Sequence, residues 1–405
     1  MSRIVVVGGG AAGFFAAIAA AEAAPGREVV LLESGRQFLQ KVRISGGGRC
    51  NVTHSCFDPR ELSQRYPRGG RALIAPFHRF QPRDTIEWFA ARGVQLKTEA
   101  DGRMFPTTGD SATIVDCLLG AAREAGVQLR PGLAVRAVRP DGPGFVLELA
   151  DGSELMCDRL CVATGGCRAP QSLRWLVGLG HTLEPPVPSL FTFHIDVPWL
   201  RELPGVATEV EATIPGTKLR ERGPLLVTHW GVSGPAILRL SAWGARDLHD
   251  RDYQFSLRVN WLPGRSADDV LAEFQARRAS QPGKAVVNSP LAGVPSRLWE
   301  ALAREAGIGA DVRWTTLSRP CALALAERLV RTELPVTGKS LNKDEFVTCG
   351  GVRLREVDFK TMESRVRPGL YFAGEVLDID GVTGGFNFQA AWTTGWIAGH
   401  AMAEG

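Results

Sequence analysis

Three glycines near the start of the chain, Gly8, Gly10 and Gly13, lie between an expected strand and an expected helix. The run RIVVVG at residues 3–8 is apolar and β-branched, as in a central parallel strand, and an Ala-rich helix follows it up to Pro25. Glycines at this spacing permit a tight turn, the close approach of a pyrophosphate, and close packing of the helix on the strand. The sequence therefore predicts an α/β unit that binds a dinucleotide.

A carboxylate ends the next expected strand, EVVLLE at residues 28–33. Glu33 follows Gly13 by 20 residues, the offset at which an acid accepts hydrogen bonds from the hydroxyls of an adenosine ribose. An acid here would repel a 2′-phosphate, so the pattern favours FAD or NAD over NADP. A purely structural glycine turn is the alternative, and the strand, the helix and the acid together argue against it.

The composition is that of a globular protein with no strong preference for a nucleic acid or membrane partner. The chain has 405 residues, enough for two or three domains, and a formal net charge of only +4. No apolar run is long enough to span a bilayer, and the first strand begins too early for a signal peptide, so we expect a cytoplasmic protein. None of the eight cysteines forms a Cys-x-x-Cys pair, which argues against a metal site and against the dithiol of a flavin disulfide reductase.

A change in composition at residues 185–188 (PPVP) indicates a second unit inserted in the first. Short β patterns follow it and give way to helical ones. Later, a buried strand at 369–374 and a helix at 386–402 resemble the opening architecture. The expected domains are a cofactor-binding domain in two parts, 1–187 and 342–405, and an inserted domain, 188–341, whose helical part covers roughly 266–335.

Residues 38–83 lack clear periodicity and are strongly basic. A long loop-rich segment inside a domain is usually functional, so we expect this one to line a cofactor channel. Alternatively it forms a basic contact surface for RNA, although aromatic residues are sparse in it. The basic residues are Lys41, Arg43, Arg49, Arg60, Arg65, Arg68, Arg71, Arg79 and Arg83, against the acids Asp58 and Glu61.

Three further glycine-rich blocks are candidates for cofactor contact. ATGG at 163–166 follows a short strand and would let the backbone pass near the adenosine half, although alone it is more simply a turn. SGGGRCN at 45–51 suits a planar ring that lies directly on backbone. In the third block Glu375 follows a strand, and Gly384-Gly385 begin a helix whose N-terminus would face the N1 and C2 carbonyl edge of a flavin.

One histidine of the expected inserted domain is a candidate acid or base. The segment THWGVSGP at 228–235 combines the imidazole of His229 with a tight turn and a helix start at Pro235. A single histidine is more often structural than catalytic, so both interpretations stay open. His229 is nevertheless the best candidate proton donor or acceptor in the chain.

Together these blocks resemble the BaiN-like, or YhiN-type, FAD-binding flavoprotein family, which includes enzymes described as aminoacetone oxidases. The resemblance covers nearly the full length, and its most specific parts are SGGGRCN and GLYFAGEVLDIDGVTGGFNFQAAWTTGW at 369–396. It implies a Rossmann-like FAD-binding domain formed by both chain ends, with an inserted β-barrel-like domain that carries a small helical subdomain. Cys349 departs from the family pattern, which more often has a small apolar residue there.

The resemblance also implies which residues lie near FAD. To those positions we add neighbours within the same blocks, with Cys50 as a packed thiol rather than a nucleophile, and Val135 as a strand residue whose backbone could meet the adenine. The positions matched to the family are Gly8, Gly10, Ala12, Gly13, Glu33, Lys41, Gly47, Gly48, Arg49, Thr164, Gly165, Gly374, Glu375, Asp380, Gly385, Phe386 and Asn387. The added ones are Ala11, Ser34, Cys50, Asn51, Val135, Ala163 and Gly384.

The expected function is that of an FAD-dependent oxidoreductase in which flavin N5 exchanges a hydride with a small-molecule substrate. No second glycine fingerprint for NAD(P)H is visible, so either NAD(P)H binds transiently over the flavin or the substrate itself reduces it, as an amine would. The alternatives are a flavin-containing protein that binds or modifies RNA, which we favour less, and a flavin-binding module without turnover.

Overall fold

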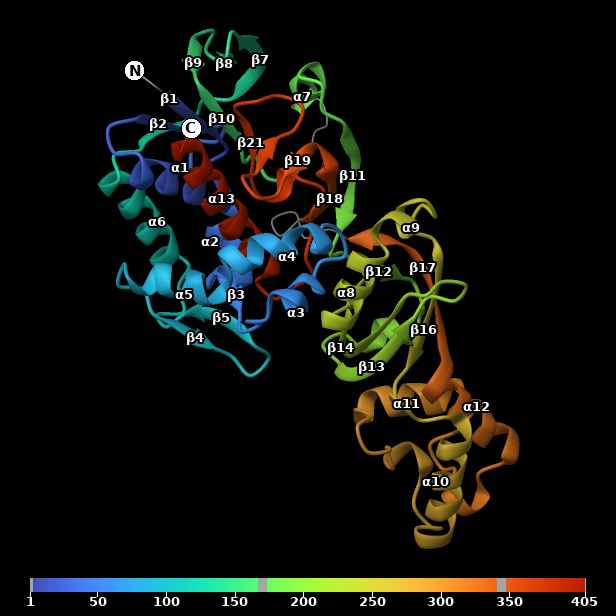
Figure 1. Ribbon diagram of the computed structural model, residues 1–405. Coiled ribbons are helices and arrows are strands. Elements are labelled where there is room, and N and C mark those ends of the chain that lie inside the picture. Colours follow the sequence, from blue (N-terminus) through green and yellow to red (C-terminus); the bar gives the residue numbers. More distant parts are fainter. Residues whose placement is uncertain (1–2, 167–172, 341–346, 405) are drawn as a thin grey trace. The chain divides into compact units, whose positions relative to one another are not determined.

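The computed structural model describes residues 3–166, 173–340 and 347–404, which fold into two compact units (Figure 1). Residues 1–189 and 343–405 form one, here the terminal unit, and residues 190–342 form the other, here the inserted unit. The first expected boundary, after residue 187, falls in strand β11. The second, after residue 341, lies outside the described residues.

A seven-stranded sheet in the order β19-β20-β21-β10-β1-β2-β6 forms the centre of the terminal unit. Strand β1 lies between β2 and β10 and is parallel to both, with Val6 beside Leu31 and Cys161. Because both faces of β1 are covered, its β-branched side chains are buried. Strand β21 (Leu370–Phe372) comes from the second part of the chain and pairs with β10 in parallel. This confirms a Rossmann-like domain built from both chain ends.

Helices α1 (Ala11–Ala23) and α13 (Phe386–Glu404) join the two chain ends by packing side by side (Figure 1). Small residues allow this close approach. A Cβ at Gly395 would lie 2.4 Å from the carbonyl oxygen of Ala12, and one at Gly399 would lie 2.5 Å from that of Ala16. The Ala-rich sequence of α1 therefore serves helix packing as well as helix formation.

The expectation of a loop-rich segment at 38–83 is wrong, because helices α2, α3 and α4 occupy much of it. In α4 (Gly70–Arg79) the apolar side chains of Leu73 and Phe77 are four residues apart and are buried on one face. The basic residues Arg71 and Arg79 flank this pair and mask the apolar face in the sequence. Pro76 also lies inside α4, and a sequence-based interpretation places no helix there.

The inserted unit contains a closed barrel in the order β12-β15-β14-β13-β16-β17, and helices α10 to α12 lie in the chain between its strands β16 and β17. The barrel and the helices share one hydrophobic core, which includes Leu257, Trp261, Trp299 and Trp314. Trp261 donates its indole N–H to the Thr332 hydroxyl at 2.8 Å. The β-barrel-like insert with a helical subdomain is thus confirmed.

The remaining elements complete the two units. In the terminal unit the helices are α2 (Gln40–Gly48), α3 (Pro59–Ser63), α5 (Pro82–Ala90), α6 (Ala112–Glu124), α7 (Arg174–Gly178), η5 (Leu354–Glu356) and η6 (Gly374–Val376). Its strands are β1 (Arg3–Val7), β2 (Glu28–Glu33), β3 (Thr53–His54), β4 (Leu96–Thr98), β5 (Arg103–Pro106), β6 (Gln128–Pro131), β7 (Val135–Asp141), β8 (Gly144–Leu149), β9 (Glu154–Cys157), β10 (Arg159–Val162), β11 (Leu183–Ser189), β18 (Val347–Val352), β19 (Val357–Asp358) and β20 (Glu363–Ser364).

The inserted unit has the following bounds. Its helices are η2 (Leu200–Glu202), α8 (Pro235–Trp243), α9 (Ala245–His249), α10 (Ala267–Ser280), η3 (Val286–Asn288), α11 (Ser296–Glu305), η4 (Trp314–Thr316) and α12 (Arg319–Arg331). Its strands are β12 (Thr192–Ile195), β13 (Ala207–Thr213), β14 (Arg220–Thr228), β15 (Gly231–Ser233), β16 (Phe255–Asn260) and β17 (Thr332–Ser340).

Candidate cofactor-binding site

The turn from β1 into α1 has the close backbone contacts that its glycines predict. Gly8 has φ +113°, and a Cβ at this position would lie 2.3 Å from the carbonyl oxygen of Ala163. A Cβ at Gly13 would lie 1.8 Å from the carbonyl oxygen of Gly8. At Gly10, by contrast, the space beside the backbone is open. No side chain caps the N-terminus of α1 and its first turn has no acid, so its amides and positive dipole end suit a pyrophosphate.

Glu33 is held at the end of β2 by backbone amides. Its two carboxylate oxygens accept hydrogen bonds from the N–H of Gly9 at 2.8 Å and of Gly35 at 2.7 Å. The Ser34 hydroxyl lies 3.1 Å from the same carboxylate. These contacts orient the acid beside the glycine turn, where it suits the adenosine ribose of a dinucleotide. Leu133 donates its N–H to the carbonyl of Glu33, which brings Val135, two residues later, to this end of the sheet.

The SGGGRCN loop forms a backbone surface with unusual dihedral angles, and it overlaps the end of α2, where Ser45, Gly46 and Gly47 depart from helical geometry. Gly46, Gly47, Gly48 and Cys50 all have positive φ, between +58° and +84°. Nothing lies within 4 Å of a Cβ built on Gly47 or Gly48, so their side of the loop is open. Side chains at these glycines would fill that space. The loop therefore fits a flat ring such as isoalloxazine laid against its backbone.

Neighbouring side chains support this loop. Arg49 pairs with Glu99 at 2.6 Å, and its guanidinium carbon lies 4.0 Å from the centre of the Phe105 ring. Cys50 is fully buried, and burial raises the pKa of its thiol to about 12. A thiol in this state is a poor nucleophile, in agreement with its expected packing role.

Asn51 joins the SGGGRCN loop to the start of α13. The side-chain amide of Asn51 is oriented so that both its nitrogen and its oxygen are hydrogen-bonded. The nitrogen donates to the carbonyl of Thr53 and the oxygen accepts from the N–H of Gly385, each at 3.0 Å. Gly384 and Gly385 have φ of +132° and +90°, which permits the close turn that precedes the helix. The first turn of α13 contains no acid, so its dipole is available to an anionic group.

Glu375 lies where three separate segments of the terminal unit meet. Its carboxylate is 2.7 Å from the ammonium of Lys41, and it is the nearest group to a Cβ built on Gly165, at 3.8 Å. Gly374 has φ +74° and donates its N–H to the Thr394 hydroxyl of α13 at 2.9 Å. The structure thus brings together residues that the sequence places in three different blocks. Thr164, next to Gly165, is exposed.

Asp380 makes side-chain contacts that its sequence position does not reveal. Its fully buried carboxylate pairs with the Arg68 guanidinium and accepts a hydrogen bond from the Ser189 hydroxyl at 2.7 Å. Burial raises the pKa of Asp380, while Arg68 and Ser189 oppose that shift. Its side chain therefore stabilises the loop before α13. Asn387 does the same, since its amide bonds both the N–H and the carbonyl of Gly381.

Sequence reasoning assigned no individual role to Tyr66 or Arg68, and both contact the block that precedes α13. Tyr66 donates its hydroxyl to the carbonyl of Phe386 at 2.6 Å, and burial raises the pKa of that hydroxyl. His54 stacks on the Phe386 ring at 4.7 Å. No local pattern signals these contacts, because they join residues more than 300 positions apart.

His229 belongs to the inserted unit, in the exposed turn between β14 and β15. The preceding Thr228 has a buried hydroxyl for which the described residues provide no hydrogen-bond partner. All the candidate cofactor residues belong to the terminal unit. His229 therefore stays a proposal.

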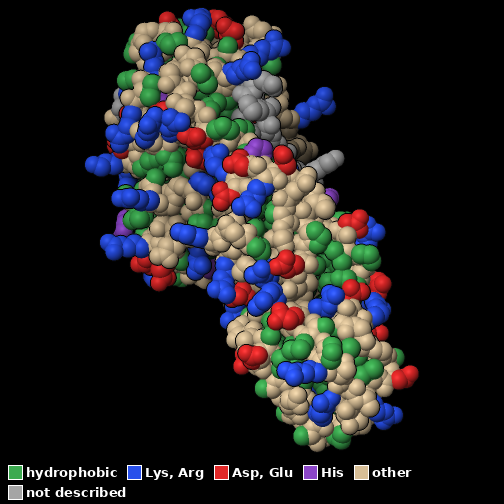
Figure 2. All heavy atoms as spheres, turned by 90° about the vertical axis from the view of Figure 1, so that its right-hand side faces the viewer, with side chains coloured by type: hydrophobic (Ala, Val, Ile, Leu, Met, Phe, Trp, Pro, Cys, Tyr) green, Lys and Arg blue, Asp and Glu red, His purple; other side chains and the backbone are tan. Residues whose placement is uncertain are grey.

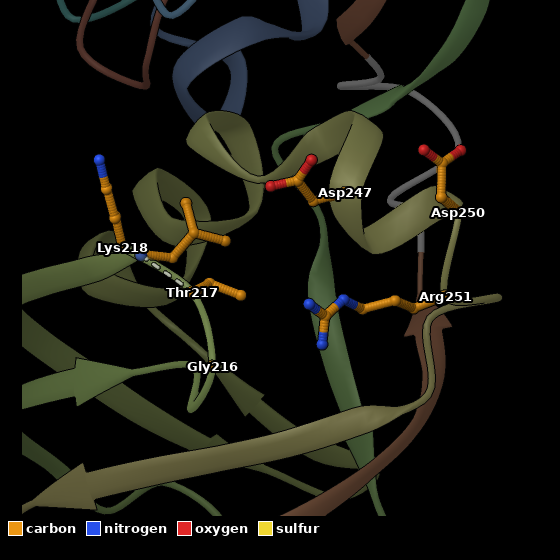
Figure 3. Close-up of a pocket in the computed structure, with 7 residues that line it drawn as sticks. Gly216, Thr217, Lys218, Asp247, Asp250 and Arg251 are labelled. Atoms are coloured by element: carbon orange, nitrogen blue, oxygen red, sulfur yellow. Dashed lines mark hydrogen bonds between the residues drawn. The ribbon is translucent and has the colours of Figure 1, made fainter.

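The inserted unit also has an open pocket of about 460 Å³ between the β13–β14 turn and α9 (Figure 3). Figure 3 shows Lys218, Asp247, Asp250 and Arg251 around it, with both signs of charge. It contains none of the candidate residues. Among the described residues no group of three or more His, Cys, Asp or Glu could hold a metal ion, and none of the described helices is long and apolar enough to cross a bilayer.

Comparisons with known proteins agree with this geometry. Residues 2–401 match the family model described as HI0933-like protein Rossmann domain. The chain is 33% identical to the ribosomal RNA dihydrouridine synthase of Escherichia coli K12 over 92% of this chain and 91% of the relative. It is 31% identical to the 3-dehydro-bile acid delta(4,6)-reductase of Clostridium scindens over 93% of each chain. The Haemophilus influenzae ribosomal RNA dihydrouridine synthase is 29% identical over 94% of this chain and 93% of its own length.

A solved structure shows a similar fold at low sequence identity. The 3-ketosteroid delta1-dehydrogenase of Sterolibacterium denitrificans superposes with a TM-score of 0.53 and 14% identity, over all of both chains. At this identity the likeness concerns the fold alone.

Proposed function

The chain belongs to the HI0933-like family and is an FAD-dependent oxidoreductase, and on this basis we propose that it reduces a carbon–carbon double bond conjugated to a carbonyl group. The sequence alone named no substrate and left open whether NAD(P)H or the substrate itself, such as an amine, reduces the flavin. The reaction adds a hydride to the carbon farther from the carbonyl and a proton to the nearer one.

The names of the relatives support this reaction class. Dihydrouridine is uridine whose C5=C6 bond, conjugated to the C4 carbonyl, has gained two hydrogens, and two of the relatives are named for its synthesis. A delta(4,6)-reductase of a 3-oxo steroid acts on double bonds conjugated in the same way. The two substrates differ greatly in size, yet the bond that is reduced has the same electronic character.

The observation that carries the proposal is the open backbone surface of Gly47 and Gly48, linked through Asn51 to the start of α13. Gly47 and Gly48 would lie against the face of the cofactor ring, and the helix N-terminus would favour negative charge on its edge. The α1 N-terminus would hold the pyrophosphate and Glu33 the ribose. When bound in reduced form, FAD supplies the hydride.

We assign the proton to His229. It is exposed at the end of β14, and an imidazole exchanges protons near neutral pH. Its segment lies between Thr228 at the end of β14 and Pro235 at the start of α8. No metal is required in this scheme, since a proton donor alone completes the addition.

Uridine in RNA is the substrate that we propose first, because two of the three named relatives act on ribosomal RNA and the terminal unit has many arginines. A small conjugated ketone of the steroid type is the second candidate, on the name of the Clostridium scindens relative. We propose NAD(P)H as a transient electron donor for either one.

An anaerobic titration tests the reaction class. The purified protein, loaded with FAD, is mixed first with NADH, NADPH or small amines while the visible flavin band is followed. The reduced protein is then mixed with uridine-containing RNA or with a 4,6-dien-3-one steroid. We expect a nicotinamide to bleach the band, and one of the two acceptors to restore it while gaining two hydrogens by mass spectrometry.

The opposite pattern would contradict the proposal. Bleaching by an amine alone, with neither acceptor restoring the band, would make the protein an amine oxidase or dehydrogenase. A protein that retains no flavin after incubation with FAD would disprove the role of the glycine loops as well.

A further inference from the structure

A pocket of about 380 Å³ lies on the terminal unit, outside the candidate cofactor site. It is formed where the start of α4 meets the segment from η5 to Phe359. Residues 69–72 of the basic segment, which the proposed function does not use, contribute one of its walls. The lining residues are Gly69, Arg71, Ala72, Leu354, Arg355 and Phe359.

The side chains of the two arginines of this pocket have no partner among residues 3–166, 173–340 and 347–404. Among the described residues, neither the Arg71 nor the Arg355 side chain has a hydrogen bond or an ion pair, and both are exposed. Nearby arginines differ in this respect, since Arg68 pairs with Asp380 and Arg365 lies 3.5 Å from Asp358. Two guanidiniums left free at one pocket provide fork-shaped donors that match phosphate oxygens.

The rest of the lining is apolar. Ala72, Leu354 and Phe359 are half-buried, so the pocket has an aliphatic and aromatic surface next to its charges. An aromatic ring beside arginines is the combination on which a nucleotide base stacks while its phosphates are held. A small inorganic anion would use the arginines but not Phe359.

The pocket adjoins the segment that leads to α13. Gly69 lines the pocket, and a Cβ on it would lie 2.4 Å from the Ile379 side chain. Ile379 precedes Asp380, the buried carboxylate that stabilises the loop before Gly384 and Gly385. A ligand in the pocket would therefore rest on the backbone that supports the start of α13.

We propose that this pocket binds a nucleotide of single-stranded RNA, with phosphates on Arg71 and Arg355 and the base against Phe359. The inference rests on the proposed reduction of uridine in RNA and adds the surface that holds the strand. Further Lys and Arg side chains are spread over the terminal unit, in the upper part of Figure 2, and would attract the rest of the strand. Base stacking and phosphate contact require no particular sequence, so this surface would provide affinity more than specificity.

Charge reversal with a matched control tests the pocket. The FAD-loaded R71E/R355E variant is compared with R123E/R136E, which makes the same change in net charge at two exposed arginines of α6 and β7 in the same unit. Binding of a fluorescein-labelled single-stranded RNA is followed by anisotropy over a range of KCl concentrations. We expect R71E/R355E to weaken RNA binding at least about tenfold. The slope of log binding constant against log KCl concentration should become shallower by about 1.4, the change that the loss of two phosphate contacts on a single strand would cause. The control should stay within about twofold of the wild type.

The same samples separate this inference from the proposed function. Both variants should keep their flavin and its bleaching by nicotinamide, because neither pair belongs to the cofactor site. Equal losses of RNA binding in the two variants, or none in R71E/R355E, would overturn the pocket while leaving reduction of the double bond in place. A wild-type protein that does not bind RNA but reduces the steroid would overturn it too. If neither the RNA nor the steroid reoxidises the reduced protein, the proposed function itself is disproved.

Discussion

The Lys41 ammonium lies 2.7 Å from the carboxylate of Glu375, and so joins α2 to η6 across 334 positions of the chain. Lys41 is 41% exposed and Glu375 is 15% exposed. A pair with one exposed partner contributes little to stability, about 1 kcal/mol or less. Its importance is therefore expected in cofactor binding, where the ammonium offsets the Glu375 charge beside Gly165.

Replacement of Lys41 should separate these two effects. In Lys41→Gln we expect the free energy of unfolding of the FAD-free protein to change by less than about 1 kcal/mol. FAD affinity should fall about tenfold, because an uncompensated carboxylate would then stand close to a bound pyrophosphate. Urea unfolding and a flavin fluorescence titration measure the two quantities. Lys97→Gln, at an exposed lysine of β4, is the control, and equal FAD affinity of the two variants would disprove the role.

Glu33 should matter for FAD retention far more than the glutamate at the other end of β2. Glu33→Ala removes the acceptor of the Gly9 and Gly35 amides together with the expected ribose contact, so we expect FAD binding to weaken by roughly 10- to 100-fold. Glu28→Ala on the same strand removes a pair with Arg3 and a hydrogen bond from the Gln128 amide, and it should retain FAD. Flavin content after gel filtration checks both variants, and unchanged occupancy in Glu33→Ala would refute the assignment.

The close contact of α1 and α13 makes Gly395 intolerant of a methyl group. Gly395→Ala would place a Cβ 2.4 Å from the Ala12 carbonyl oxygen, and we expect a loss of about 1–3 kcal/mol in the free energy of unfolding. Gly120→Ala in α6 is the matched control, because nothing lies within 4 Å of its Cβ. Alanine there should be neutral or stabilising by up to about 1 kcal/mol. Equal effects in urea unfolding would show that the helix contact is not tight.

His229 should affect turnover without affecting the cofactor. For His229→Gln we expect kcat to fall about 100-fold at neutral pH, with FAD content unchanged, because only proton delivery is lost. The pH dependence of the remaining activity should also lose the limb that belongs to the acid. His249→Gln, at an exposed histidine of the same unit, is the comparison. If the two variants have the same kcat and the same pH profile, another group delivers the proton.

Buried thiols should make the protein less stable in alkaline solution. Burial raises the pKa of Cys50 and Cys157 to about 12, against an ordinary value of 9.0. Between these values the unfolded chain loses protons that the folded chain keeps, so the free energy of unfolding falls as pH rises above 9. Each thiol contributes at most about 1.4 kcal/mol per pH unit. Urea unfolding at several pH values checks the slope, and Cys50→Ala should make it shallower. A flat profile above pH 9 would contradict the burial of these thiols.

The backbone turns that the sequence predicted are fixed by local geometry. Gly13 is recognisable because a Cβ there would lie 1.8 Å from the Gly8 carbonyl oxygen of the same turn, and Gly8 because its φ is +113°. SGGGRCN was recognisable for the same reason, since its glycines and Cys50 have positive φ. The expectation of loops at 38–83 failed because the burial of Leu73 and Phe77 depends on what packs over α4.

The sequence by itself determined the α/β class, the return of the second chain end to the first sheet, and the positions of the glycine turns. The class and the turns follow from periodicity or backbone freedom within a few neighbouring residues, and the return of the second chain end follows from the resemblance to a known family. Only the tertiary structure decided that Asp380 pairs with Arg68, that Glu375 meets Lys41, and that Arg71 and Arg355 find no partner in the part of the chain that the structure describes. Whether a charged side chain finds a partner depends on which segments the fold brings next to it. Desolvation and Coulomb attraction are set by the surrounding atoms and not by the order of residues in the sequence.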